Sequence, residues 1–167
     1  MHIAVQLEPA AGTTSKVEYT WDADTDILSA QLSPRTSGDG LSGSVEVEGS
    51  DGSWVILDVA AGHINGVEIA VWPDVRKLPV LAPPANVQDA QVLVPSRRSQ
   101  PQVAAVEIDT RVIAETDTAE RTFHFRLGKL RESRTVRIAR DLLVDVDERS
   151  TISGLWLLNV PPCPNAA

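Results

Sequence analysis

Apolar and polar residues alternate along much of the chain. Val67, Ile69 and Val71 stand at every second position and are separated by Glu68 and Ala70. The same period recurs at residues 3–7, 45–48, 136–140 and 155–160. Because successive side chains of a strand point to opposite faces, this period predicts strands that bury one face and leave the other to solvent or a second layer.

Helices are not predicted. No window of about eleven residues has a helical period, and the best helix candidate, Asp109–Arg121, is rich in β-branched residues. Gly49–Ser53 separates two apolar segments and predicts a hairpin loop. Prolines gather in residues 73–101, and because proline cannot donate to a sheet ladder, this region is predicted to be a connector or a sheet edge.

The two halves of the chain resemble each other. Val55–Val59 is similar to Leu142–Val146, and each of these segments is followed by a glycine, Gly66 or Gly154. Further short matches occur in the same order at a nearly constant offset. We interpret this as a tandem duplication, with a first β repeat at 1–80, a Pro-rich connector at 81–101 and a second β repeat at 102–167. Because each half is small, the two are expected to share one core across a pseudo-two-fold axis.

The sequence therefore predicts an all-β fold, an antiparallel barrel or sandwich built as one compact unit from two similar halves. We expect Gly66 and Gly154 at the entry to a strand, where a positive φ or a close backbone approach would require glycine. Asp58 and Asp145 end apolar segments, and we expect them to cap the turns that follow.

Two segments also follow a recurring motif. Trp21–Leu28 is W-D-A-D-T-D-I-L, and Asp145–Leu155 carries D-x-D, then I-S-G-L. They resemble a family of short bacterial and archaeal domains with the pattern Y-D-x-E-x-D-x-L followed by D-x-D-x-x-G-x-I-x-G-I-E-I. Here Trp21 takes the place of the tyrosine, and Ser150 and Trp156 replace a glycine and a glutamate. The family has no assigned function, so the resemblance implies a small strand-rich fold and no particular chemistry.

Asp22, Asp24 and Asp26 alternate along the first of these segments. Their side chains could close an Asx-turn, or their oxygens could ligate calcium. Ile27 stands where a calcium loop of the EF-hand type needs a glycine, so we favour the turn.

Candidate chemistry elsewhere is sparse. Cys163 is the only cysteine, which excludes an intramolecular disulfide and a thiolate zinc site. The three histidines, His2, His63 and His124, lack the spacing of a metal site. Phosphate-binding glycine motifs and a nucleophile elbow are missing from the sequence. We therefore predict no metal and no cofactor.

The formal net charge is −8, from 23 acidic and 15 basic residues in a chain of 167. An acidic chain repels phosphates and anionic lipid, so nucleic acid and membranes are poor partners. The N-terminal residues lack the pattern of a signal peptide, and no stretch is as long as a membrane span. We expect a cytoplasmic protein whose partner is a small molecule or another protein, and a homodimer is left open.

His124 and Arg126 alternate with Phe123 and Phe125 on a predicted strand. If the phenylalanines face the core, His124 and Arg126 face outward together. If His124 faces inward, it lines a cavity with Arg126 beside it. These two residues and Glu68 are our candidates for the polar groups of a catalytic site.

The tryptophans, Trp21, Trp54, Trp72 and Trp156, stand out in a chain with only 4% aromatic residues. Core packing would explain them, and a cavity or interface lined by indole rings is the alternative. The first functional hypothesis is a protein without catalytic motif that binds a small apolar ligand or a protein partner through these rings. The second is a cofactor-independent cyclase or isomerase of small-molecule metabolism acting in a barrel cavity, since such an enzyme needs only a shaped pocket and a few polar groups. A purely structural subunit is the third.

Overall fold

The computed structural model describes residues 2–10, 15–33, 39–96 and 103–165. Within these ranges the regular structure is strand throughout, with no helix, so the all-β prediction is confirmed. The strands are β1 (Gln6–Pro9), β2 (Glu18–Trp21), β3 (Leu28–Gln31), β4 (Ser42–Gly49), β5 (Trp54–Ala60), β6 (His63–Val71), β7 (Val75–Leu78), β8 (Gln88–Leu93), β9 (Val103–Thr110), β10 (Val112–Asp117), β11 (Phe123–Leu127), β12 (Ser133–Ala139), β13 (Leu142–Asp147) and β14 (Ile152–Leu157).

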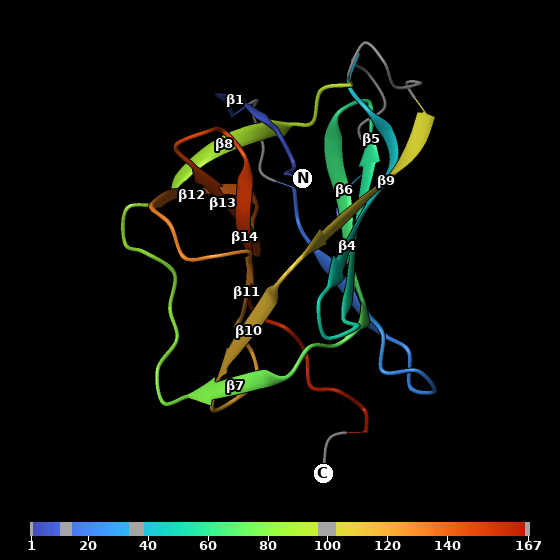
Figure 1. Ribbon diagram of the computed structural model, residues 1–167. Coiled ribbons are helices and arrows are strands. Elements are labelled where there is room, and N and C mark those ends of the chain that lie inside the picture. The colour runs from blue at the N-terminus through green and yellow to red at the C-terminus, as the bar shows by residue number, and fades with distance from the viewer. Residues whose placement is uncertain (1, 11–14, 34–38, 97–102, 166–167) are drawn as a thin grey trace.

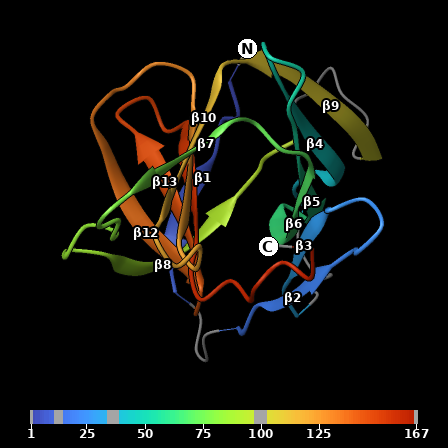
Figure 2. The same ribbon diagram turned by 90° about the horizontal axis from the view of Figure 1, so that it is seen from below.

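These strands form a curled, barrel-like sheet. Their hydrogen-bonded order is β7-β10-β11-β14-β13-β12-β8-β6-β5-β4-β9, with β1 beside β8, β3 beside β6 and β2 beside β3. Figure 1 shows β10–β14 on one side of the molecule and β4–β6 with β9 on the other, and Figure 2 shows the same two groups from below. We call β2–β6 with β9 the first layer and β7 with β10–β14 the second layer.

Three neighbouring pairs are parallel: β7 with β10, β8 with β12, and β4 with β9. The expectation of a purely antiparallel sheet is wrong for these pairs. Each joins a strand that ends before residue 96 to a strand that begins at residue 103 or later, so the two halves of the chain contribute strands to each other's layers. Alternation along the chain cannot reveal such partners, because parallel neighbours are not joined by a short hairpin.

The predicted connector at 81–101 contains a strand of its own, β8. This strand pairs with β1, with β12 and, at one residue, with β6. It therefore lies between the layers and links them.

Two predicted turns are confirmed. Gly49–Ser53 closes the hairpin between β4 and β5, and the Gly49 N–H donates to the Ser53 carbonyl oxygen at 2.7 Å. In the segment of three aspartates, Asp22 Oδ1 accepts a hydrogen bond from the Asp24 N–H at 2.9 Å, which is an Asx-turn. Asp26 completes this turn with a φ of 58°.

The two layers repeat one strand order. It is β2-β3-β6-β5-β4 in the first layer and β10-β11-β14-β13-β12 in the second. In each layer one row of neighbouring residues crosses four strands. The first-layer row is Gln31, Gly66, Asp58 and Ser44. The second-layer row is Arg126, Gly154, Asp145 and Thr135.

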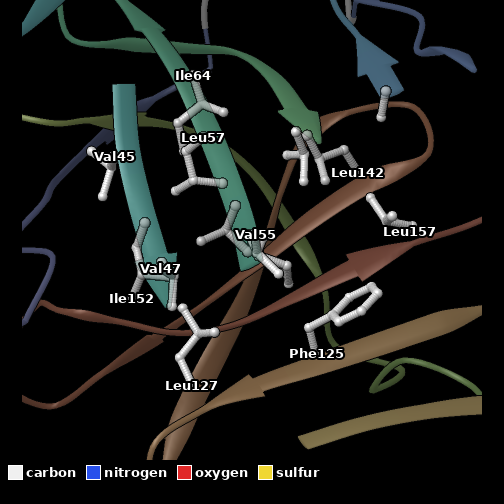
Figure 3. Packing of buried hydrophobic residues seen from close by; sticks show 14 of the residues in the cluster. Val45, Val47, Val55, Leu57, Ile64, Phe125, Leu127, Leu142, Ile152 and Leu157 are labelled. Atoms are coloured by element: carbon white, nitrogen blue, oxygen red, sulfur yellow. The ribbon is translucent and has the colours of Figure 1, made fainter. Parts of the chain in front are cut away.

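The apolar faces of both layers meet in one hydrophobic core. In Figure 3, Val45, Val55 and Leu57 of the first layer lie opposite the labelled side chains of the second, among them Phe125 and Leu157. Burying a side chain of this kind contributes about 1.5–3 kcal/mol each. This core holds the layers together, and the polar positions of each strand are left on the outer faces.

Candidate functional site

Strand β11 determines where the candidate histidine points. Phe123, Phe125 and Leu127 are buried in the core, so the alternate residues His124 and Arg126 lie on the outer face of the second layer. Of the two predicted orientations, the outward one is therefore correct.

Two neighbours hold the His124 ring. Its Nε2 lies 2.8 Å from Oδ2 of Asp145. Its ring centroid lies 4.2 Å from that of Trp156, with 30° between the ring planes. The His124 and Asp145 side chains are only 17% and 12% exposed. The pair is thus nearly buried although it lies outside the main core.

The Asp145 carboxylate is the centre of these contacts. Its Oδ1 accepts hydrogen bonds from Thr135 Oγ1 at 2.5 Å and from Trp156 Nε1 at 3.2 Å. Burial alone would raise the pKa of this carboxyl, but the hydrogen bonds from His124, Thr135 and Trp156 and the charge of His124 outweigh burial and lower the pKa. Asp145 is therefore ionised at neutral pH, and the His124 Nε2–H donates to it.

The expectation that Asp145 caps a turn is wrong. It lies within β13, which continues to Asp147, and Asp58 likewise lies within β5. The turn after β13 is capped by Asp147, whose Oδ1 accepts from the N–H groups of Arg149 and Thr151 at 2.9 and 3.0 Å. The apolar segment ends at Asp145 because this side chain faces His124, Thr135 and Trp156 on the outer face of the layer, whereas the strand itself continues.

Gly154 makes room for the histidine and aspartate. A Cβ at this position would lie 2.6 Å from Asp145 Oδ2 and 3.0 Å from His124 Nε2. Neither Gly154 nor Gly66 has a positive φ. A positive φ therefore explains neither glycine. Close approach of neighbouring atoms explains Gly154, whereas a Cβ on Gly66 would lie 3.3 Å from its nearest atom and is less crowded.

His124 lines a pocket of about 170 Å³ on this face. Arg126, Lys129 and the exposed Leu130 also line it, and Pro84 contributes from the 79–87 segment between β7 and β8. This segment runs along the outer side of the second layer, where Figure 1 shows it in green. The pocket therefore lies between the outer face of the second layer and the 79–87 segment.

Positive charge is in excess in this pocket. Among the described residues, neither Arg126 nor Lys129 lies within ion-pair distance of a carboxylate. The only acid lining it is Asp145, which is already bonded to His124. In a protein with a net charge of −8, this is a local concentration of positive charge.

Arg131 fixes the turn that carries Lys129. Its Nε donates to Asp147 Oδ2 at 2.6 Å, and its Nη1 donates to the carbonyl oxygens of Leu127 and Lys129 at 2.8 and 3.0 Å. Burial would raise the pKa of Asp147, but hydrogen bonds from Thr151 and Arg131 hold it well below its usual range. Both partners are thus charged, and Arg131 is not free to bind a ligand.

A larger hollow of about 520 Å³ adjoins the pocket and shares Lys129 and Arg131 with it. There the cations are offset by Glu132, Asp147 and Glu148. Since His124 and Asp145 do not line it, we place the candidate site in the smaller pocket.

Glu68 does not join this site. It stands between the core residues Val67 and Ile69 on β6 and lies opposite Ser29 and Ile56 on the outer face of the first layer. The two layers face each other across the core, so Glu68 and His124 point away from the molecule on different sides.

Trp21 and Trp72 pack between the layers. Their rings stack with centroids 5.6 Å apart, and Trp72 lies 5.3 Å from Phe123. Both indole N–H groups donate to carbonyl oxygens, that of Trp21 to Pro161 at 2.9 Å and that of Trp72 to Asp26 at 2.8 Å. The Trp21 bond joins the N-terminal and C-terminal parts of the chain, and the ring contacts are those expected of packing residues.

The other two tryptophans lie apart from this pair. Trp156 is 7% exposed and belongs to the His124 pocket, whereas Trp54 is 39% exposed beside Val71 at one end of the first layer. The structure therefore does not gather the four rings into one binding surface.

Asp145, Thr135 and Lys129 complete the site without having been predicted as members. Asp145 is a polar residue at an outward position of the mostly apolar strand β13, which is a signal in the sequence that marks it, whereas Thr135 lies on the mixed strand β12 and has no such signal. The contacts of Asp145 with His124 and with Thr135 depend on the register of four strands.

Among the described residues, no three histidine, cysteine or acidic side chains lie close enough together to hold a metal ion. In the same part of the chain there is no helix that could span a bilayer. Comparison of the chain with known protein families and with curated proteins found no match.

Proposed function

We propose that the protein binds a small anionic molecule in the His124 pocket. The observation that carries this proposal is a cavity in which Arg126 and Lys129, neither of which forms an ion pair with a described residue, stand beside an imidazole held by Asp145. A carboxylate or phosphate would accept charge-assisted hydrogen bonds from both cations. A concave site with a few convergent polar groups is the form that ligand sites usually take.

The size of the pocket limits the ligand. Its volume of about 170 Å³ is well below the ~300–1,000 Å³ of pockets for drug-sized ligands. Leu130 and Pro84 provide apolar surface next to the cations. The expected apolar ligand is therefore replaced in this proposal by a small molecule with an anionic group and a short apolar part.

Calorimetric titration with acetate, benzoate and phosphate tests the proposal, with the NMR signals of the His124 ring and the Trp156 indole reporting the place of binding. Arg126→Gln should weaken binding by about 10-fold or more, because a hydrogen bond to a charged group contributes about 1.5–3 kcal/mol. Arg134→Gln is the matched control, since it removes the same charge from an exposed position outside the pocket. An unchanged His124 signal at saturating anion, or equal weakening by both variants, would contradict the proposal.

A protein partner is the second candidate. Trp54 and Val71 are opposite each other on β5 and β6 and are 39% and 46% exposed, which makes a small apolar patch. If the patch joins two copies of the chain, sedimentation analysis should show a concentration-dependent dimer that Trp54→Ser abolishes.

We also propose that the two layers are copies of one module related by a pseudo-two-fold axis. The common strand order, the two corresponding rows and the sequence matches support this. The resemblance to the family of short bacterial and archaeal domains stays a prediction. An experimental structure should superimpose β2–β6 on β10–β14 with Gly66 on Gly154, and a best fit that pairs other residues would contradict the duplication.

A cytoplasmic location is proposed on the basis of the single cysteine, which leaves no intramolecular disulfide. Cell fractionation of the tagged full-length chain tests this directly.

A further inference from the structure

Anion binding by Arg126 and Lys129 does not explain why the His124 ring is held so closely. The ring has a hydrogen bond of 2.8 Å to Asp145 on one side and the Trp156 indole at 4.2 Å on its face. Gly154 is needed to let the two side chains approach. Such restraint defines the orientation and the tautomer of an imidazole.

The tautomer follows from the aspartate. Because ionised Asp145 can only accept, the neutral His124 ring carries its proton on Nε2 and its lone pair on Nδ1. Among the described residues, Nδ1 has no hydrogen-bond partner, and the only buried side-chain nitrogen without one is Nε of Arg137. The lone pair of Nδ1 is therefore open to the pocket that His124 lines.

We propose that His124 acts as a general base that removes a proton from a carbon next to a carbonyl group in a small carboxylate bound in the pocket. This inference rests on the proposed binding function and adds a reaction to it. His124 would be the catalytic residue, and Asp145 would be a positioning residue that acts through it.

The step is balanced without a cofactor. The C–H bond breaks, the proton moves to His124 Nδ1, and the electron pair forms the carbon–carbon double bond of an enolate whose oxygen takes the negative charge. Arg126 and Lys129 stabilise that charge, and Asp145 stabilises the imidazolium. Exchange results when a solvent deuteron replaces the proton on His124 and is then delivered to the same carbon, and delivery of the proton to a neighbouring atom gives an isomer.

Several charged groups face His124 and would act together on the pH dependence of the rate. Asp145 approaches from β13, Glu115 lies opposite on β10, Arg126 shares β11, and Lys129 follows in the next turn. The 79–87 segment contains no titratable side chain. A measured pH profile therefore reports these groups as a set.

The test uses the full-length protein with pyruvate in D₂O, with the methyl proton signal followed by NMR. The protein should accelerate loss of this signal, and His124→Gln should reduce the accelerated rate by about 100-fold or more, to the level of buffer. His2→Gln is the matched control, because His2 is exposed and lies outside the pocket. Asp145→Asn should slow exchange at least ~10-fold and change its pH profile, because an amide can donate to Nε2 and reverse the tautomer.

The same samples separate the two proposals, since pyruvate binding is read from the His124 and Trp156 signals. Binding without exchange overturns the base and leaves the binding function. If neither binding nor exchange is seen, both the binding function and the general base are overturned. Equal exchange by the His124→Gln variant overturns the role of His124. Should that variant fail to fold, carbethoxylation of the imidazoles in the unaltered protein must abolish exchange, and exchange that survives full modification refutes the proposal.

Discussion

Gly154→Ala tests the geometry of the site most directly, because it adds one methyl group at its tightest point. The new Cβ would lie 2.6 Å from Asp145 Oδ2, 3.0 Å from His124 Nε2 and 3.0 Å from the carbonyl oxygen of Phe125. None of these atoms is the free end of a flexible chain. Asp145 is bonded to three side chains, and the Phe125 oxygen belongs to the backbone of β11.

The cost can be worked out from two effects. Overpacking of a buried position costs about 1–3 kcal/mol. Displacing Asp145 from His124 weakens a charge-assisted hydrogen bond of about 1.5–3 kcal/mol. Against these, replacing glycine with alanine stabilises a compatible site by about 0.4–1 kcal/mol through the unfolded chain. We therefore expect Gly154→Ala to lower the free energy of unfolding by about 3 kcal/mol.

Gly66→Ala is the matched control, since Gly66 occupies the corresponding place in the first-layer row. Its Cβ would meet only the Ala30 oxygen at 3.3 Å and side-chain atoms beyond 3.5 Å. We expect this variant to change the unfolding free energy by less than about 1 kcal/mol. At about 2–4 °C per kcal/mol for a chain of this size, Gly154→Ala should melt roughly 6–12 °C lower. Thermal melting followed by circular dichroism measures the two variants, and equal melting temperatures of Gly154→Ala and Gly66→Ala would refute the close approach at Gly154.

Three further outcomes are expected. The lowered pKa values of Asp145 and Asp147 contribute stability that is present above the ordinary carboxyl value of 3.8 and is lost as pH falls from there through the lowered values, so the urea midpoint should begin to drop near about pH 4 and keep dropping below about pH 3. Asp147→Asn should make the urea midpoint fall less steeply with pH, and an unchanged pH dependence would argue against the contribution of Asp147. Trp72→Ala should cost about 3 kcal/mol, measured by thermal melting, because it removes the ring between Trp21 and the core. Asp22→Ala should cost about 1 kcal/mol by loss of the Asx-turn bond, while millimolar calcium should leave the melting temperature of the unaltered chain unchanged.

Local patterns predict the strands well because the period of two reflects one buried face. Val67 and Ile69 on β6 and Phe123 and Phe125 on β11 are buried as their alternation indicates. The hairpin loop at Gly49–Ser53 follows from turn residues alone. What alternation cannot specify is the partner of each strand, and this is why the three parallel pairs were not predicted.

The site was predicted only in part for the same reason. His124 and Arg126 are neighbours on one strand, so their common face follows from the sequence. Asp145 and Thr135 come from other strands, and their approach to His124 depends on cross-strand register. Glu68 lies on the outer face of the first layer, and its place in the sequence carries no information about which layer it occupies.

The first-layer and second-layer rows show that burial, and not only residue type, determines how strongly an aspartate side chain binds its hydrogen-bond partners. Asp58 and Asp145 stand at corresponding places, each next to a glycine on the following strand. Asp58 is exposed, so water competes for the hydrogen bonds of its oxygens. Asp145 is 8% exposed, where water competes little and each hydrogen bond from a side chain is stronger. Corresponding places in the two rows thus hold an aspartate that faces water in one layer and an aspartate that orients an imidazole in the other.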